Sequence, residues 1–142
     1  MKKEKIFIGS DHGGFKLKEA LKKIFAKKII LIDLGTDSEK SVDYPDFAKK
    51  VALKVKKEKA KGILLCGTGI GVSIAANKIK GIRAALVYDK TTARLAKQHN
   101  DANIVCLGGR TTSEKDAWQI VNIWLSGKFE KGRHLRRIKK IE

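Results

Sequence analysis

The chain has 142 residues, of which 42% are hydrophobic, and no change in composition divides residues 1–142, so we expect one ordinary domain with a core. No apolar run approaches the roughly 20 residues of a membrane helix, which argues against a membrane partner and indicates a soluble, cytoplasmic protein. The net charge of +17 invites a nucleic-acid interpretation, but charge spread over many lysines is typical of a solvated surface, so we expect no nucleic-acid partner.

Short apolar runs alternate with amphipathic stretches along the chain. A strand at 5–9 precedes a helical pattern at 15–27, and a second strand at 29–34 leads through a polar loop to Pro45, which suits the first turn of a helix. The later strands are expected at 62–65, 83–88 and 103–107, and the later helices at 72–79, 91–98 and 113–125. Near-continuous apolar strands alternating with helices predict a three-layer α/β/α Rossmann-like fold with a five-stranded parallel sheet.

The glycine-rich turn after the third strand, C-G-T-G-I-G at 66–71, is the most informative segment. Its glycines let the backbone approach a ligand and turn N–H groups toward negative charge, and the following helix start adds partial positive charge. A thiol in that field loses its proton more easily. The segment predicts an anion-stabilising site with Cys66 as an acid/base group, and a tight turn with a buried cysteine is the alternative.

Titratable and polar side chains follow the predicted elements at several points. Ligands of parallel sheets bind at the carboxyl ends of the strands. We therefore expect one active edge at which several such groups converge. Its candidate members are Asp11 and His12 after the first strand, Cys66 and Thr68 after the third, Arg110 after the fifth, and His99, Asn100 and Asp101 at the end of the helix that follows the fourth.

The last segment, 129–141, is too basic for a core. Arg133 and Arg137 are four residues apart, so on a helix they project side by side and could hold one phosphate together. A solvated basic tail is the alternative.

Together these motifs resemble ribose-5-phosphate isomerase type B, in the superfamily that also holds the galactose-6-phosphate isomerase subunits. The resemblance spans nearly the whole chain in order. It rests on Asp11, His12 and Gly14, on 43–45, on 66–71, on Asn77, on 81–84, on 98–101, and on 132–134 with Arg137.

The resemblance implies interconversion of ribose 5-phosphate and ribulose 5-phosphate through a cis-enediolate, with no metal and no organic cofactor. It implies that His99 opens the sugar ring with help from Asp11 and that Cys66 is the base. Some relatives use a glutamate at the position of Val72, which valine cannot replace. The N–H groups of the turn would hold the enediolate oxygen, and Thr68 would protonate or orient it; the turn residues concerned are Gly67, Gly69, Ile70 and Gly71.

The resemblance also implies a phosphate site shared between two subunits. The phosphate would be held by residues of both subunits, with the arginines of the last segment supplied by the second, so we expect a homodimer or a dimer of dimers. The phosphate ligands implied are His12, Arg110, Arg133 and Arg137, and further substrate contacts fall on Tyr44, Asn100 and His134.

Three other functions remain as alternatives. An isomerase of allose or galactose 6-phosphate differs only in pocket walls. A nucleotide-binding module is disfavoured because the first turn reads D-H-G-G and no Lys followed by Ser or Thr comes after Gly71. A nucleic-acid-binding protein would show steep salt dependence, but the lysines recur on expected solvent faces of helices, as at Lys16, Lys18, Lys22 and Lys23.

Two kinds of side chain are interpreted as structural. Cys106, between Val105 and Leu107, is expected to be an inert core thiol. Two cysteines far apart in sequence, both at or in predicted strands, make neither a disulfide framework nor a zinc quartet, so both are expected to be reduced. Trp118 and Trp124 are expected to be packing or dimer-interface anchors.

Overall fold

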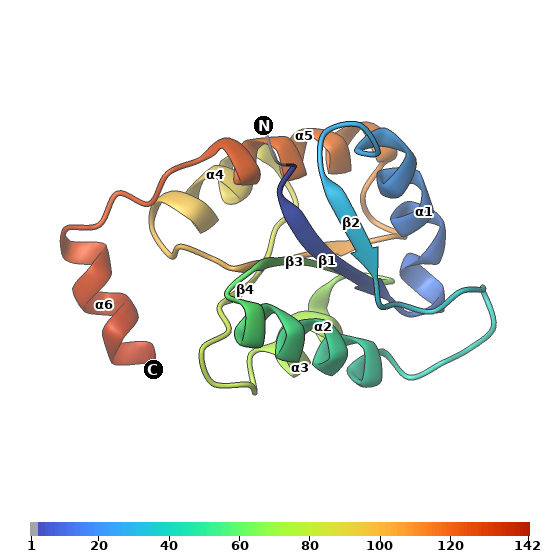
Figure 1. Ribbon diagram of the computed structural model, residues 1–142, viewed down its shortest axis with the longest axis horizontal. Helices are drawn as coiled ribbons and strands as arrows, with labels where there is room; N and C mark the ends of the chain where they lie inside the picture. The colour runs from blue at the N-terminus through green and yellow to red at the C-terminus, as the bar shows by residue number, and fades with distance from the viewer. Residues whose placement is uncertain (1–2) are drawn as a thin grey trace.

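The computed structural model describes residues 3–142, and its strands form one parallel sheet in the order β2-β1-β3-β5-β4 (Figure 1). The strands are β1 (Lys5–Ser10), β2 (Ile30–Asp33), β3 (Lys61–Cys66), β4 (Ala84–Leu86) and β5 (Ile104–Gly108). The helices are the short 3-10 helix η1 (His12–Gly14) and α1 (Phe15–Ile24), α2 (Tyr44–Glu58), α3 (Ile70–Ala76), α4 (Lys90–Gln98), α5 (Glu114–Ser126) and α6 (Arg133–Ile141). The predicted five-stranded parallel sheet is confirmed.

The sheet is covered on both faces, as the near-continuous apolar strands predict. Side chains alternate along a strand, so Ile63 and Leu65 of β3 join one core while Leu64 and Cys66 join the other. Helices α1, α4 and α5 cover the first face, and α2 and α3 cover the second (Figure 1). Cys66 therefore ends its strand on the side of α2 and α3.

Because all strands run in the same direction, the sheet has a carboxyl edge, where the strands end, and an amino edge, where they begin. At the carboxyl edge Ser10 pairs with Leu65 and Cys66 pairs with Gly108. Each of the helices α1 to α4 leaves from that edge and returns the chain to the amino edge, where the next strand begins. Residues that follow strands and residues that follow these helices therefore lie at opposite edges.

The element boundaries differ from prediction mainly where a local feature overrides periodicity. The third helix begins at Ile70 rather than 72, because Gly69, with φ of 82°, already turns the chain into the helix. The fourth strand covers 84–86 instead of 83–88; among the strands of residues 3–142 it is an edge strand that pairs with β5 alone. The predicted basic segment contains α6, which begins only at Arg133.

Lys18 corrects our expectation of a solvated lysine face on the first helix. Its side chain is buried and its ammonium group pairs with Asp33 at the end of β2, and Nζ lies 3.6 Å from Glu19 Oε2. Burial opposes ionisation of Asp33, but hydrogen bonds from Lys18, Lys22 and the Gly35 N–H outweigh it and hold the pKa of that carboxyl below its usual value. Helical periodicity did not reveal this pair because the acid comes from another element.

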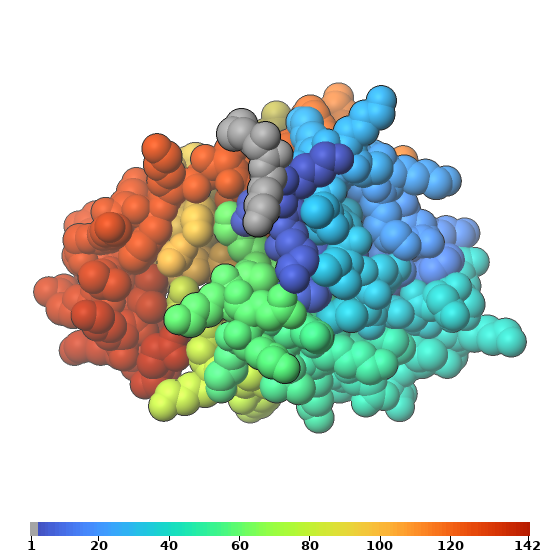
Figure 2. Space-filling view, in the orientation of Figure 1, coloured from blue at the N-terminus to red at the C-terminus, as the bar shows by residue number. Residues whose placement is uncertain are grey.

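Helix α6 forms one end of the molecule (Figure 2), and it lies beyond the amino edge of the sheet (Figure 1). Just before α6, the Glu130 N–H donates to the Gln98 carbonyl at 3.0 Å. Just after α6, Glu142 Oε1 lies 3.1 Å from the Arg83 guanidinium. Ile138 is the one buried residue of α6. None of the helices within residues 3–142 combines the length and the apolar character needed to cross a membrane.

Candidate active site

A cavity of about 460 Å³ opens at the carboxyl edge of the sheet. It is bounded by the ends of β1, β3 and β5 and by the first turns of α2 and α3. Its lining residues are Asp11, Tyr44, Cys66, Gly67, Thr68, Ile70, Gly71, Ile74 and Arg110. All of them except Ile74 were predicted as site residues. Helical spacing could have identified Ile74, because it lies one turn after Ile70 and therefore on the same face of α3. We call this set the carboxyl-edge site.

Cys66 is the potential nucleophile or base of this site. Its thiol is 6% exposed, lines the cavity, and accepts a hydrogen bond from the Gly69 N–H at 3.1 Å. The left-handed conformation of Gly69 turns that N–H back toward the sulfur, and a side chain there would meet the Leu107 carbonyl carbon at 2.9 Å. A main-chain donor aimed at Sγ stabilises negative charge on it, which a base requires.

Thr68 is exposed at the mouth of the cavity, and its Oγ1 accepts the Ile70 N–H at 3.2 Å. The hydroxyl proton is therefore free to be donated to a substrate. The N–H groups of Gly69 and Ile70, which we expected to face the enediolate oxygen, are engaged by the Cys66 and Thr68 side chains instead. The turn thus uses two of its donors to hold its own reactive groups.

Asp11 and His12 are held by main-chain contacts. Asp11 is buried, and its Oδ1 accepts the N–H groups of Gly13 at 2.9 Å and Gly14 at 3.2 Å. His12 is half-buried, lies outside the cavity lining, and accepts the Val42 N–H on Nδ1 at 3.1 Å. Neutral His12 therefore carries its proton on Nε2, which leaves an N–H donor for an anion.

Tyr44 and Arg110 line the cavity beside two glycines of the turn. The Tyr44 ring lies across Gly71, where a Cβ atom would stand 2.7 Å from the ring carbon Cζ. Glycine is therefore required at 71 for the ring to lie against α3. Arg110 lies across Gly67, whose carbonyl accepts the Arg110 N–H at 2.9 Å, and its guanidinium is exposed toward the cavity.

The other predicted site residues gather at the amino edge, which corrects our expectation of a single active edge. His99 caps the end of α4, a helix that begins at the carboxyl edge and finishes beside the start of β5. His99 and Asn100 therefore lie far from the carboxyl ends of the strands. The rings of His99 and His134 stack with centroids 4.1 Å apart and planes 14° apart. We call His99, Glu130 and His134 the amino-edge cluster. Asn100 and Arg133 are next to its members in sequence, and Arg137 follows His134 by three residues on α6.

Glu130 is the member of the amino-edge cluster that sequence reasoning missed. Its Oε1 lies 3.6 Å from Nε2 of His99 and 3.5 Å from Nε2 of His134. Glu130 precedes α6 in an irregular segment, where no periodicity marks it. The guanidinium-bearing residues Arg133 and Arg137 are exposed on α6.

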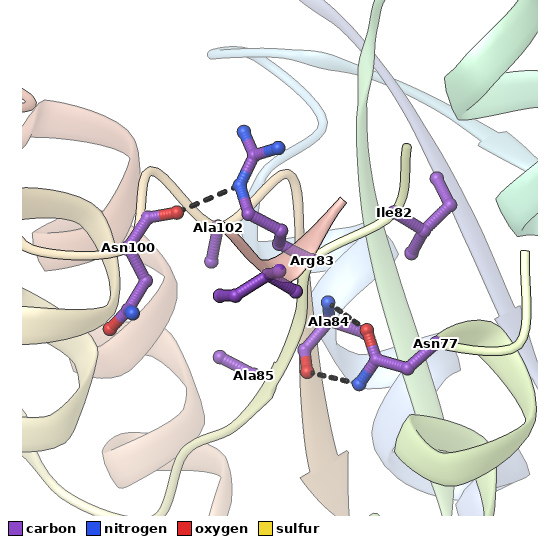
Figure 3. Close-up of a pocket in the computed structure, with 8 residues that line it drawn as sticks. Asn77, Ile82, Arg83, Ala84, Ala85, Asn100 and Ala102 are labelled. Carbon is purple, nitrogen blue, oxygen red and sulfur yellow. Dashed lines mark hydrogen bonds between the residues drawn. The ribbon is translucent and has the colours of Figure 1, made fainter. Parts of the chain in front are cut away.

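A second cavity, of about 270 Å³, is lined by Asn100, the residue after His99, together with Asn77 and Arg83 (Figure 3). The Asn77 side chain bonds both main-chain groups of Ala84, at 2.8 and 2.9 Å, and Arg83 Nε donates to the Asn100 carbonyl at 2.9 Å. Ile141 of α6 also lines it. These contacts anchor Asn100 and α6 to the sheet and bring no acid/base group into this cavity.

Two of the three residues interpreted as structural, Cys106 and Trp124, lie in the core as expected. Cys106 is fully buried, and its burial, together with the neighbouring Cys66, raises the pKa of its thiol far above the usual value. Trp124 is fully buried and its Nε1 donates to the Ala102 carbonyl at 2.9 Å, whereas Trp118 is partly exposed. The predicted core role of Cys106 and packing role of Trp124 are confirmed.

Comparison with known proteins gives one consistent family. The family model described as Ribose/Galactose Isomerase matches residues 6–141. A curated relative, the probable ribose-5-phosphate isomerase B of Mycoplasma genitalium, is 49% identical over 140 residues, covering 96% of this chain and 92% of the relative.

Solved structures agree with the sequence match. The crystal structure of a ribose 5-phosphate isomerase from Thermotoga maritima superposes with a TM-score of 0.95 at 54% identity, covering 97% of each chain. The M. genitalium ribose-5-phosphate isomerase B with bound ribulose-5-phosphate has a TM-score of 0.93 at 47% identity, covering 99% of this chain and 95% of that one. With this coverage and the thiol, carboxylate and glycine turn at the carboxyl edge, the chain belongs to the ribose/galactose isomerase family.

Proposed function

We propose that this chain interconverts ribose 5-phosphate and ribulose 5-phosphate. The observation that carries the proposal is the Cys66 thiol, which lines the carboxyl-edge cavity while the Gly69 N–H donates to its sulfur. Relatives named ribose-5-phosphate isomerase B, and one related structure with bound ribulose-5-phosphate, support this substrate over a hexose 6-phosphate. A reduced Cys66 is required for this chemistry, which suits a cytoplasmic enzyme.

Ring opening is the first step, because ribose 5-phosphate in solution is mostly a closed ring. The C1–O4 bond breaks, O4 takes a proton, and the O1 hydroxyl loses one as the C1 carbonyl forms. The Asp11 carboxylate, fixed at the cavity by two N–H donors, accepts the O1 proton. His99, in its imidazolium form, supplies the proton for O4.

Isomerisation then moves two protons within the open chain. The Cys66 thiolate removes the proton from C2, the electron pair forms the C1–C2 double bond of the enediolate, and the thiol returns the proton to C1. A second proton passes from O2 to O1. The Thr68 hydroxyl suits this transfer, since its oxygen is held by the Ile70 N–H while its proton stays free.

This sequence of steps needs two copies of the chain. Asp11 and Cys66 lie at the carboxyl edge, whereas His99 lies at the amino edge of the same sheet, so the groups required for ring opening are not in one cavity of one chain. A two-fold axis would bring the carboxyl-edge site of each copy against the amino-edge cluster of the other. Helix α3 offers a surface for that contact, because Ile74 is 58% exposed beside the cavity.

The same assembly would complete the phosphate site. His12 and Arg110 of one copy would meet Arg133 and Arg137 of the other, which are exposed on α6 without contact to their own carboxyl edge. The C-terminal segment from about 129 to 142 would then serve the partner's site. A homodimer is the smallest such assembly, and a dimer of dimers contains it.

The direct test is a panel of pentose 5-phosphates and hexose 6-phosphates offered to the purified protein. Turnover of ribose 5-phosphate with much slower turnover of allose and galactose 6-phosphates is the expected result. Preference for a hexose phosphate would move the chain to the alternative substrate class. Absence of turnover with every sugar phosphate would remove the proposed function.

A further inference from the structure

Glu130 has no role in the reaction steps proposed above, although it lies beside the imidazole of His99. A single carboxylate oxygen faces Nε2 of both stacked imidazoles, at 3.6 Å for His99 and 3.5 Å for His134. These are ion-pair distances rather than hydrogen bonds. The main chain adds a second tie, because the Glu130 N–H donates to the carbonyl of Gln98, the residue before His99. Glu130 thus connects the end of α4 to the start of α6 through both its backbone and its side chain.

The same three side chains could be taken for a metal site, since their ligand atoms lie within 4.8 Å of one another. The ring geometry argues against it. An imidazole binds a metal through a lone pair in the plane of its ring, and two rings stacked 14° from parallel direct these lone pairs side by side rather than toward one point. The arrangement instead suits an acid that is oriented by a carboxylate.

We propose that Glu130 is a positioning residue for ring opening, which orients the His99 imidazole so that its Nδ1 proton is the one delivered to the sugar. This inference rests on the proposed function and deepens it. His134 contributes by stacking on His99 and by sharing the carboxylate. Glu130 itself touches no reacting atom of the sugar in this mechanism.

The geometry assigns a separate task to each nitrogen of His99. In the imidazolium form both nitrogens carry protons, and the one on Nε2 faces the Glu130 carboxylate. The proton on Nδ1 is therefore free to pass to the ring oxygen O4 as the C1–O4 bond breaks, while Asp11 takes the O1 proton. After the transfer, His99 is neutral with its remaining proton on Nε2, and it regains the Nδ1 proton from solvent.

The two sugar phosphates separate ring opening from the later proton transfer. Ribose 5-phosphate is cyclic and must be opened, whereas ribulose 5-phosphate cannot close a five-membered ring because its O5 carries the phosphate. Exchange of the C1 proton of ribulose 5-phosphate with deuterated water therefore reports the enediolate step, in which Cys66 is the base, without ring opening. Turnover of ribose 5-phosphate reports both steps.

The experiment compares Glu130→Gln with wild type in both assays. We expect turnover of ribose 5-phosphate to fall by about tenfold to a hundredfold, the range that misplacement of a catalytic group produces, while C1 exchange stays unchanged. Nitrogen NMR of His99 should show that the tautomer of its neutral form shifts away from Nε2–H. Glu142→Gln removes an equal charge from the same end of the chain, where it pairs with Arg83, and should leave both assays unchanged.

Other outcomes overturn the inference. Equal losses in the two assays would show that Glu130 merely supports the structure, and an unchanged turnover of ribose 5-phosphate would show that it does not position His99. Wild-type protein that turns over no pentose phosphate would instead remove the proposed function, and with it the role of Glu130. A melting temperature equal to that of wild type is required of each variant, and Glu130→Ala provides a second test if Glu130→Gln is unstable.

Discussion

The two edges of the sheet carry functional side chains in contrasting ways. At the carboxyl edge, Cys66 and Asp11 are nearly buried and held by main-chain N–H groups, so their placement follows from the fold itself. At the amino edge, the His99 and Glu130 side chains are 39% and 50% exposed and hold one another. A buried group fixed by backbone donors is complete within one chain. In the part of the chain that the structure describes, the amino-edge cluster has no such backbone donors to its side chains, and its geometry depends on contacts among the side chains themselves.

The largest effect should come from the carboxyl edge. Cys66→Ala removes the proposed base and should lower turnover by at least about a thousandfold, within the range attributed to acid/base catalysis. Circular dichroism should show an unchanged fold, because the turn is held by its glycines. Cys106→Ala is the matched control, since that thiol is buried in the core, and it should lose stability but keep activity. Near-normal turnover of Cys66→Ala would remove the base from the mechanism.

Mixing variants tests whether the two edges work in different chains. Cys66→Ala and His99→Ala should each be inactive alone. After subunit exchange, half of the dimers contain one chain of each variant, and each of these mixed dimers has one intact site out of two. The mixture should therefore recover about a quarter of wild-type activity. Cys66→Ala mixed with Asp11→Ala should recover nothing, because both changes fall at the same edge. No recovery in the first mixture would mean that the edges do not meet across a dimer.

Arg137→Ala tests the phosphate contact proposed for the amino-edge side. A hydrogen bond to a charged group contributes about 1.5–3 kcal/mol. Its loss should raise KM for ribose 5-phosphate by at least about tenfold, with a smaller effect on kcat. The neighbouring Arg136 lies on a different side of α6, so Arg136→Ala is the control. Equal KM values for Arg137→Ala and wild type would count against a phosphate role.

The smallest effect concerns the stability of the carboxyl edge and involves no activity. Asp33→Asn leaves the ammonium group of Lys18 buried with Glu19 as its remaining partner, and should lower the free energy of unfolding at neutral pH by about 3 kcal/mol. Lys18→Met keeps an apolar side chain of similar length and removes the charge, so it should lower the free energy of unfolding by a smaller amount. Urea denaturation measures both.

The pH dependence of this effect has a definite sign. The pKa of Asp33 is lowered in the folded state, so its contribution is fully present above the unfolded value of about 3.9 and is lost as the pH falls through the folded value. The difference in stability between wild type and Asp33→Asn should therefore shrink in acid. A difference that stays constant from neutral to acidic pH would contradict the ion-pair interpretation.

Local patterns were sufficient to predict much of the carboxyl-edge site. A strand, a glycine turn and a helix start are neighbours in sequence, so Cys66, Thr68 and Gly71 could be placed without knowledge of the rest. The error over His99 came from treating the end of a helix as though it were the end of a strand. In a parallel sheet a helix that begins at the carboxyl edge must end at the amino edge, so the connectivity already contained the correction.

Two features depended on contacts between distant elements. Lys18 has the spacing of a solvent-facing residue, and only the approach of β2 places Asp33 beneath it. Glu130 lies in an irregular segment, and only the return of the chain to α4 sets its carboxylate beside the two stacked histidines. Neither contact leaves a periodic trace in the sequence.

The amino-acid sequence by itself determined the parallel α/β sheet and the glycine turn that holds Cys66, because apolar periodicity and turn chemistry act between residues close along the chain. The tertiary structure alone decided that the titratable groups divide between opposite edges of the sheet and that a carboxylate joins the two histidines. Those relations depend on how helices return across the sheet and on which side chains then face one another, and packing in three dimensions sets both.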